Sequence, residues 1–269
     1  MTNRSLKGLI LDVAGTFIDF GSMAPTDALL NSFSKFGLKL TNEEVRYGMG
    51  LLKIDHTNAI FSQQSVIKKW LKVYKRPVEA KDIQDVYAQI EIELKSIVKN
   101  YCEPINGIYE LKEYAKNNNI KIGTTTGYTQ EMMDIIIPEL TERNLIMDSM
   151  VNPSMVQAGR PHPWMIYENM KNMGIYPTYD MIKIGDTFAD IDEGRNAGMW
   201  VIAFTTGNEL GITFEKYLKL EEPLLNKKNK DIKNKFLEYG AHYVCDGIWD
   251  VIPTIQLIKN KISNNEYPF

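Results

Sequence analysis

Short apolar runs alternate with stretches of helical spacing along most of the chain. The first run, Leu6–Val13, is nearly continuous, as expected for a strand that is buried on both faces of a parallel sheet. Further strands are predicted at Ile120–Thr125, Met147–Val151, Met181–Ile184, Trp200–Phe204 and Ala241–Val244. Helices are predicted at Gly107–Lys116, Gln130–Leu140, His162–Met173 and Thr187–Ala197. This alternation predicts an α/β fold with a doubly wound parallel sheet.

The stretch 24–101 departs from this alternation. It has no convincing strand pattern, and its apolar residues recur at helical spacing. Within it, Thr41 begins a Thr-Asn-Glu-Glu sequence in which Glu44 can bond back to the Thr41 amide, a capping box that starts a helix. We therefore expect a Rossmann-like core domain formed by 1–23 and 102–269, with an all-helical cap domain, 24–101, inserted into it.

The composition mainly excludes some classes of partner and of fold. The 269 residues carry 31 Lys and Arg against 34 Asp and Glu, so the formal net charge is 31 − 34 = −3. Without a basic field we expect no nucleic-acid partner, and no apolar run approaches the roughly 20 residues of a membrane span. Cys102 and Cys245 are too few for a disulfide framework. We expect a cytoplasmic protein with no membrane partner.

Polar residues follow the predicted strands, at the edge where a doubly wound sheet binds its ligands. Each of them alone is weak evidence, because an acid after a strand is often only a helix N-cap and a Thr-Gly pair is usually a turn. Together, on successive strands, they can form one phosphoryl-transfer site. They are Asp12, Thr126, Gly127, Arg160, Asp186 and Asp190.

The residue types suggest a role for each group. Asp12 would be the nucleophile, and Asp186 with Asp190 would hold a divalent cation that offsets the repulsion between carboxylate and phosphate. Fork-shaped guanidinium groups are well suited to phosphoryl oxygens. The groups that would bind the non-bridging oxygens are the Thr126 hydroxyl, the Gly127 amide and Arg160.

Two carboxylate regions, a hydroxyl and a cation, in this order, resemble the four motifs of the haloacid dehalogenase superfamily. Most phosphatases of that superfamily resemble the pattern Asp-x-Asp, in which the second acid protonates a departing alkoxide. Here Ala14 takes that second position. The sequence therefore favours a leaving group that needs no proton from that side.

A further candidate group lies in the helical stretch, in the sequence Met-Gly-Leu-Leu-Lys-Ile-Asp-His. Met49, Lys53 and His56 are spaced i, i+4 and i+7, which predicts one face of a helix. A lone lysine is most often a solvated surface residue, and a lone histidine is more often structural than catalytic. The apolar neighbours Met49 and Leu52, however, would favour the neutral amine that a nucleophilic lysine requires.

Several segments resemble the phosphonoacetaldehyde hydrolase (phosphonatase) family, and the resemblance runs from about Leu6 to Thr206. The lysine-bearing segment is the discriminating one, because the superfamily shares the others. The segments are Leu-Asp-Val-Ala-Gly-Thr, Met-Gly-Leu-Leu-Lys-Ile-Asp-His, Gly-Thr-Thr-Thr-Gly-Tyr-Thr, Gly-Arg-Pro-His-Pro-Trp-Met and Gly-Asp-Thr-x-x-Asp-x-x-Glu-Gly-Arg-Asn-Ala-Gly-Met-Trp.

This resemblance implies hydrolysis of the P–C bond of phosphonoacetaldehyde to acetaldehyde and phosphate, in phosphonate degradation. The reaction would proceed through a Schiff base on Lys53 and an aspartyl phosphate on Asp12. It further implies a small-molecule phosphonate substrate and a homodimer formed through the cap. It implies that Mg²⁺ is bound by Asp12, the Ala14 carbonyl and Asp186, with support from Asp190.

The resemblance also implies roles for residues around the lysine. His56 would work with water in proton transfer, Met49 would shield Lys53, and Tyr128 would lie near the closing cap. The chain departs from the family pattern at Val13 and Phe17, where a Trp and a second Thr are usual. Another departure is Ser22, where Cys or another small residue is expected. These departures bear on cap packing and substrate preference.

Two other interpretations remain open on the sequence alone. The first is a phosphomonoester hydrolase or phosphomutase of the same superfamily, which Ala14 disfavours. The second is a catalytically silent binding protein that keeps the fold. The intact polar groups at the strand ends argue against it, because drift would not be expected to spare all of them.

Overall fold

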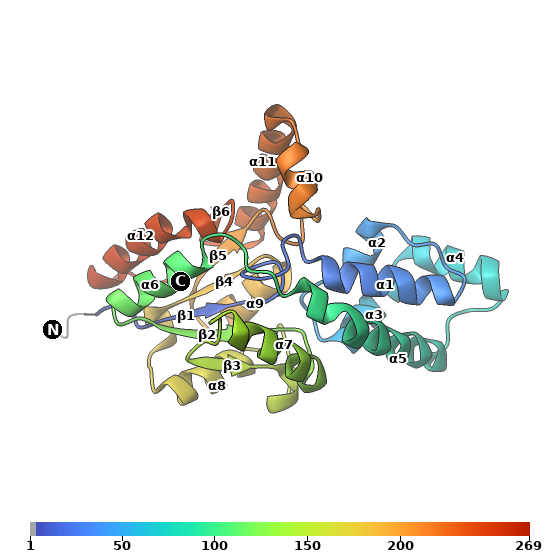
Figure 1. Ribbon diagram of the computed structural model, residues 1–269, viewed down its shortest axis with the longest axis horizontal. Helices are drawn as coiled ribbons and strands as arrows, with labels where there is room; N and C mark the ends of the chain where they lie inside the picture. The colour runs from blue at the N-terminus through green and yellow to red at the C-terminus, as the bar shows by residue number, and fades with distance from the viewer. Residues whose placement is uncertain (1–3) are drawn as a thin grey trace.

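A six-stranded parallel sheet forms the centre of the larger part of the molecule in the computed structural model, which describes residues 4–269 (Figure 1). Residues 1–3 of the predicted core segment 1–23 lie outside the described residues. The strand order is β3-β2-β1-β4-β5-β6. The strands are β1 Gly8–Leu11, β2 Lys121–Thr125, β3 Ser149–Val151, β4 Met181–Gly185, β5 Trp200–Phe204 and β6 Tyr243–Cys245.

The central strands are apolar because both faces of the sheet are covered. On β1, Leu9 and Leu11 belong to one hydrophobic cluster and Ile10 belongs to another on the opposite face. On β5, Ile202 and Val201 divide between the two faces in the same way. The near-continuous apolar runs of the sequence follow from this two-sided burial.

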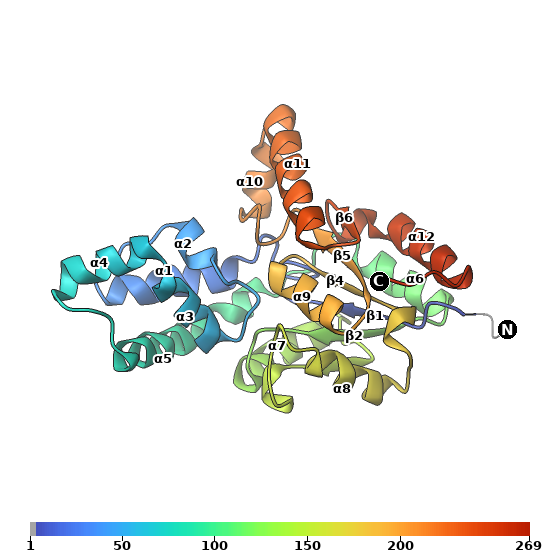
Figure 2. The ribbon, with the colours of Figure 1, turned by 180° about the vertical axis from the view of Figure 1, so that it is seen from behind.

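Helices cover both faces of the sheet (Figures 1 and 2). Those that share the first cluster are α6 Ile108–Asn117, α7 Gln130–Glu142 and α12 Val251–Ser263. Those on the opposite face are α8 Trp164–Met173, α9 Phe188–Asn196 and α11 Glu222–Tyr239. Together with α10 Phe214–Lys219, α11 projects away from the sheet (Figure 1). The remaining 3₁₀ turns of this part are η2 Pro153–Met155, η3 Thr178–Asp180 and η4 Ile248–Asp250.

A separate group of helices lies to one side of the sheet (Figure 1). These helices are α1 Met23–Lys35, α2 Asn42–Arg46, α3 Lys53–Ser62, α4 Gln64–Tyr74 and α5 Ala80–Ile97, followed by η1 Val98–Tyr101. Within the described residues 4–269, no strand occurs between 24 and 101, as the sequence predicted. The doubly wound sheet with inserted helices is thus confirmed, while the division into two domains at 24 and 101 stays a prediction.

The capping box predicted at Thr41 is present and begins α2. The Thr41 amide donates to Glu44 Oε2 at 2.8 Å, and the Glu44 amide donates to Thr41 Oγ1 at 3.2 Å. The two bonds satisfy backbone groups that the start of a helix otherwise leaves without partners. This short helix matters for the site because its last two residues, Val45 and Arg46, contact other parts of the molecule.

Two neighbouring stretches of chain connect the helices to the sheet. The first leaves β1 and the second returns from η1, and they meet at a bridge between Ile18 and Pro104. The Ile105 amide donates to the Phe17 carbonyl at 2.8 Å. Phe17 and Val13, two of the departures from the family pattern, are fully buried in the core cluster. In the part of the chain that the structure describes, no helix has the length and apolar character needed to cross a membrane.

Candidate active site

The predicted groups converge on one small cavity at the carboxyl ends of the strands. Its volume is about 20 Å³, so little free space remains between the sheet and the helices. It lies where the strand order reverses between β1 and β4, the usual ligand position in such a sheet. The predicted site residues that line it are Asp12, Ala14, Met49, Lys53, Thr126, Gly127, Tyr128 and Arg160.

Three buried carboxylates meet beside this cavity. Asp12 follows β1 and Asp186 follows the adjacent β4, and the Asp12 amide donates to the Ile184 carbonyl at 2.8 Å. Asp190 lies in the first turn of α9. One ligand atom from each of the three acids lies within 4.8 Å of the others. Parallel pairing of the two strands therefore brings together acids that are distant in the sequence.

The charges of these acids are only partly compensated by the protein. Burial raises the pKa of Asp186 well above its usual value, and the nearby carboxylates of Asp12 and Asp190 raise it further. Burial also raises the pKa of Asp12, although Arg160 opposes the shift. The ionised acids thus call for additional positive charge, and oxygen ligands suit a hard divalent cation. The residues present therefore fit a divalent metal ion.

Asp190 differs from the other two acids because two cationic side chains lie within 3.1 Å of one of its oxygens. Its Oδ1 lies 2.9 Å from Lys183 Nζ and 3.1 Å from Arg160 Nη2. Its Oδ2 accepts from the Thr187 hydroxyl at 2.6 Å, in a capping box that begins α9. Burial alone would raise the pKa of Asp190, but the two cations outweigh it and lower the pKa. Asp190 is therefore better placed to support the other groups than to bind a metal directly.

Arg160 connects the nucleophile candidate to the base of the site. Its Nη2 donates to Asp12 Oδ1 at 2.7 Å and to the Thr125 carbonyl at 2.8 Å, and its Nε donates to Glu193 Oε2 at 3.0 Å. Burial would lower the pKa of Arg160, but the surrounding carboxylates outweigh it, so the guanidinium stays charged. Its Nη1 lies only at 3.5 Å from the Gly50 carbonyl. Nη1 is therefore the guanidinium nitrogen with the most freedom to donate to an anionic ligand.

The turn after β2 supplies further donors. The Thr126 hydroxyl accepts from the Tyr128 amide at 3.2 Å, which leaves its own proton free to point into the cavity. Gly127 permits a close approach, because a Cβ at that position would lie 2.7 Å from the Leu51 carbonyl oxygen. Gly50 makes a similar approach to Thr187 from the helical side. The turn 50–51 therefore sits directly on the strand ends.

Lys53 enters the cavity as the first residue of α3 and is 3% exposed. Burial lowers the pKa of its amine to about 8, although the Asp12 carboxylate opposes the shift. Its Nζ lies 5.3 Å from the centre of the Tyr128 ring. At pH 7 about a tenth of this amine is therefore uncharged, far more than for an exposed lysine.

His56 lies one turn further along α3 and is fully buried. Its Nε2 is 2.8 Å from the Val45 carbonyl, which can only accept, so the proton of the neutral ring resides on Nε2. Its Nδ1 has no hydrogen-bond partner among the described residues. Burial and the neighbouring Lys53 lower the pKa of His56 to about 3. His56 is therefore neutral, with a lone pair on Nδ1 available to a water molecule.

The expectation that Met49, Lys53 and His56 share one helix face is wrong. Helix α3 begins only at Lys53, and Met49 lies in the preceding turn. Gly48 and Gly50, which flank Met49, both have φ of +89°, a left-handed conformation that interrupts a helix. Met49 nevertheless lines the cavity beside Lys53 and is 5% exposed.

The sequence reasoning missed a buried polar network beneath the site. Thr125 Oγ1 donates to Glu193 Oε2 at 2.8 Å, and Lys183 Nζ lies 3.2 Å from the same oxygen. Lys183 and Glu193 are both fully buried. Two signals could have found them: a lysine inside the apolar strand Met-Ile-Lys-Ile, and an acid three residues after Asp190, on the same helix face.

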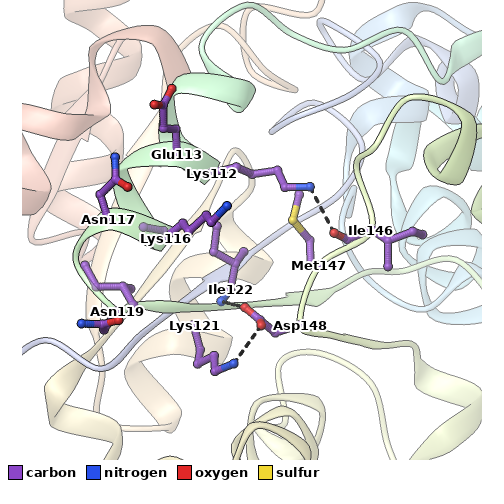
Figure 3. Close-up of a pocket in the computed structure, with 12 residues that line it drawn as sticks. Lys112, Glu113, Lys116, Asn117, Asn119, Lys121, Ile122, Ile146, Met147 and Asp148 are labelled. Atoms are coloured by element: carbon purple, nitrogen blue, oxygen red, sulfur yellow. Dashed lines mark hydrogen bonds and ion pairs between the residues drawn. The ribbon is translucent and has the colours of Figure 1, made fainter.

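A larger hollow lies elsewhere, beside the amino ends of β2 and β3 (Figure 3). Its volume is about 760 Å³, yet two of the lysines that line it are already paired. Lys112 bonds to the carbonyls of Asn144 and Ile146, and Lys121 bonds to Asp148 at 3.1 Å. Because no reactive groups converge there, the small cavity at the strand ends is the better candidate.

Comparisons with known proteins show which family this chain resembles. A family model described as haloacid dehalogenase-like hydrolase matches residues 9–204, which include the strand-end acids and the helical segment. The chain is 40% identical over 258 residues to a phosphonoacetaldehyde hydrolase from Bacillus cereus, covering 95% of this chain and 97% of that protein. It is 39% identical to a phosphonoacetaldehyde hydrolase from Bacillus cytotoxicus, with the same coverage.

Solved structures of other proteins share the fold of this chain. A phosphonoacetaldehyde hydrolase-like protein from Oleispira antarctica superposes with a TM-score of 0.95 at 29% identity, over 99% of this chain and 97% of that one. A β-phosphoglucomutase from Clostridium difficile has a TM-score of 0.65 at 17% identity, over 95% of this chain and 98% of that one. The second match supports only the fold, since its sequence is so distant.

Proposed function

Because this chain belongs to the phosphonoacetaldehyde hydrolase family of the haloacid dehalogenase-like hydrolases, we propose that it hydrolyses phosphonoacetaldehyde through a Schiff base on Lys53 and an aspartyl phosphate on Asp12. The observation that carries this proposal is that a buried lysine of lowered pKa and a buried aspartate line the same cavity. Lys53 would react with the aldehyde end of phosphonoacetaldehyde, and Asp12 would react with its phosphonate end.

The lysine is needed because a P–C bond cannot simply be displaced. Direct attack by a carboxylate would expel an unstabilised carbanion. In the proposed first step, the neutral Lys53 amine attacks the aldehyde carbon, and loss of water with uptake of one proton leaves a protonated imine. The imine nitrogen can then accept the electron pair of the P–C bond. Because Lys53 and Asp12 are buried in a cavity of only about 20 Å³, little bulk water would reach this intermediate.

Phosphoryl transfer forms the second step. A carboxylate oxygen of Asp12 attacks phosphorus while the P–C electrons pass to carbon and nitrogen, which gives an enamine on Lys53 and an aspartyl phosphate on Asp12. Protonation of the enamine carbon and hydrolysis of the imine release acetaldehyde and restore Lys53. Water then cleaves the aspartyl phosphate and releases phosphate. No acid is required at position 14, which agrees with Ala14.

Other residues that line the cavity, together with His56 behind Lys53, would hold the substrate and move protons. Thr126, Gly127 and Arg160 would bind the phosphonate oxygens, with Nη1 of Arg160 as the guanidinium nitrogen that has room for them. His56, neutral and with Nδ1 free, would exchange protons through a water molecule. Met49 and Tyr128 would shield the Lys53 amine from solvent, because both are buried and line the same cavity.

The proposal includes Mg²⁺ as the metal ion. The residues that would hold it are Asp12, the Ala14 carbonyl and Asp186, with Asp190 in support. When bound, Mg²⁺ supplies positive charge that offsets the repulsion between the Asp12 carboxylate and the phosphonate. The raised pKa values of Asp12 and Asp186 support this choice, because both acids must be ionised together.

We also propose a homodimer that forms through the helical segment. That segment exposes large apolar side chains on its outer helices, with exposed fractions of 41% for Leu71, 46% for Val73 and 59% for Ile92. Sedimentation velocity on the purified protein tests this part of the proposal. A monomer at micromolar concentration would contradict it.

The function is tested by measuring both products from phosphonoacetaldehyde in the presence of Mg²⁺. We expect acetaldehyde and phosphate in equal amounts, and only slow release of nitrophenol from p-nitrophenyl phosphate. Rapid turnover of the phosphate ester without cleavage of phosphonoacetaldehyde would instead favour a phosphomonoester hydrolase. A phosphomutase would release neither acetaldehyde nor stoichiometric phosphate.

A further inference from the structure

Arg46, the last residue of α2, joins the helical segment to a loop of the sheet part. Its Nη1 donates to the backbone carbonyl of Asn208 at 2.8 Å and lies 3.1 Å from the Asn208 side-chain oxygen. Its Nη2 donates to the Gly21 carbonyl at 2.9 Å, on the first connection between the two parts. One guanidinium thus holds the helices, the connection and the loop after β5 together.

The loop that Arg46 holds also contacts the acid at the end of β4. The Asn208 amide donates to Asp186 Oδ2 at 2.7 Å, and the Thr16 hydroxyl donates to Asp186 Oδ1 at 3.1 Å. The backbone packs tightly here, because a Cβ on Gly207 would lie 2.1 Å from the Asp186 Cβ. Any displacement of this loop would therefore change the orientation of the Asp186 carboxylate.

On its other side, the same loop packs closely against the Arg46 guanidinium at Gly211. Gly211 has φ of +59°, and a Cβ there would lie 2.8 Å from Arg46 Cζ, so any larger side chain would clash with Arg46. The Arg46 Nε is buried and has no hydrogen-bond partner within residues 4–269. The next residue, Ile212, approaches Gly21 so closely that a Cβ on that glycine would meet its carbonyl oxygen at 2.1 Å. The loop is therefore clamped from the helical side.

We propose that Arg46 is a positioning residue that links docking of the helical segment to the metal-binding geometry of Asp186. The path runs from the guanidinium to the Asn208 carbonyl, and from the Asn208 amide to the Asp186 carboxylate. This inference rests on the proposed function, in which Asp186 is a metal ligand. Linkage requires the effect to be reciprocal, so a metal ion bound at Asp186 favours the docked position of the helices.

The same end of α2 also reaches the lysine side of the cavity. Val45, the residue before Arg46, accepts a hydrogen bond from His56 Nε2 at 2.8 Å. Adjacent residues of one helix therefore contact the loop below Asp186 and the histidine beside Lys53. A shift of α2 would disturb both halves of the site together, so the helices can dock fully only when both halves are in place.

Arg46→Lys tests the proposal, because lysine keeps the charge but loses the fork whose two nitrogens bond separately to Asn208 and Gly21. The matched control is Arg76→Lys, since Arg76 pairs with Asp82 at 2.6 Å, inside the helical segment. Two readouts need no substrate: Mg²⁺ affinity by titration calorimetry, and hydrogen exchange of the backbone amides in 206–211 by mass spectrometry. Both are measured where circular dichroism shows all variants to be folded.

We expect Arg46→Lys to weaken Mg²⁺ binding about tenfold and to speed exchange in 206–211, while Arg76→Lys changes neither. Mg²⁺ affinity within about twofold of wild type, with unchanged exchange, would overturn the proposal. Should Arg46→Lys fail to fold, Asn208→Ala removes one acceptor of Arg46 and keeps the amide that bonds to Asp186. A two- to threefold weaker affinity is expected from it, and an unchanged affinity would overturn the proposal.

These outcomes separate the inference from the proposed function. If the wild-type protein cleaves phosphonoacetaldehyde but Arg46→Lys binds Mg²⁺ as tightly as wild type, only the proposed role of Arg46 is overturned. If the wild-type protein binds Mg²⁺ but does not cleave phosphonoacetaldehyde, the proposed reaction is overturned. The Mg²⁺ affinity of Arg46→Lys then still decides whether Arg46 positions Asp186. Wild-type protein that binds no Mg²⁺ would overturn both.

Discussion

Lys53, at the start of α3, and Asp12, directly after β1, line the same small cavity although they come from different parts of the fold. Their charges are also coupled. The Asp12 carboxylate raises the pKa of Lys53, yet burial dominates and the pKa falls to about 8. The proposed mechanism uses first an amine and then a carboxylate. It therefore needs an amine that is partly neutral although a carboxylate lies nearby.

Imine formation should depend on pH in a direction set by Lys53. Because its pKa is lowered to about 8, the neutral amine is the minor form below pH 8 and the major form above it. The rate of borohydride-trapped adduct formation with phosphonoacetaldehyde should rise about tenfold per pH unit below 8 and level off above it. The exposed lysine of α4, Lys72, should carry no adduct over the same range. A midpoint near pH 10 would contradict the buried environment described for Lys53.

Replacing the nucleophile should separate the two halves of the reaction. Asp12→Asn keeps the size of the side chain but removes the carboxylate, so phosphate release should fall by about 10⁴-fold or more. The imine on Lys53 should still form, because no step before it uses Asp12. Phosphate release is measured by a colorimetric assay and the trapped imine by mass spectrometry. Near-normal phosphate release from this variant would rule out an aspartyl phosphate on Asp12.

The network beneath the site should be important for stability. Glu193→Gln removes the carboxylate that pairs with Arg160 at 3.0 Å and with Lys183 at 3.2 Å, and leaves both buried cations with less compensation. We expect the free energy of unfolding in urea to fall by about 3–5 kcal/mol. The exposed acid Glu142 provides the matched control, and Glu142→Gln should change it by about 0.5 kcal/mol or less. Equal effects of the two substitutions would contradict this account.

Mg²⁺ should stabilise the folded protein through the buried acids. Their mutual repulsion raises the pKa of Asp186, and a bound divalent cation would relieve it. At a concentration about 100 times its dissociation constant, Mg²⁺ should add about 2.7 kcal/mol to the free energy of unfolding, and EDTA should remove that gain. Asp186→Asn serves as the control and should show little gain. A wild-type melting temperature that does not respond to Mg²⁺ would contradict the metal assignment.

Much of the fold could be predicted because burial determines the residue pattern directly. The run predicted at Trp200–Phe204 is the strand β5 with the same bounds, since both of its faces are covered. Predicted bounds were less accurate at the sheet edges, where β6 covers Tyr243–Cys245 and the prediction was Ala241–Val244. Edge strands are short and less buried, so their pattern is weaker.

The site could be predicted only in part, because its geometry depends on contacts between distant segments. Strand-end position identified Asp12 and Asp186, but helical spacing wrongly placed Met49 on α3, since it ignored the left-handed glycines on either side. The contact between Arg46 and Asn208 joins residues 162 positions apart, and no local pattern indicates it. Local sequence patterns therefore indicate the proposed reacting groups more readily than the residues that position them.

The central claim is that Lys53 forms an imine with the substrate, and borohydride trapping tests it most directly. The protein is incubated with phosphonoacetaldehyde, reduced with borohydride, digested and mapped by mass spectrometry, alongside Lys53→Arg and the exposed control Lys72→Arg. The account predicts a reduced adduct on Lys53 in the wild-type and Lys72→Arg proteins, and neither adduct nor acetaldehyde release from Lys53→Arg. Continued acetaldehyde release by Lys53→Arg, or an adduct on another lysine that accompanies turnover, would contradict it.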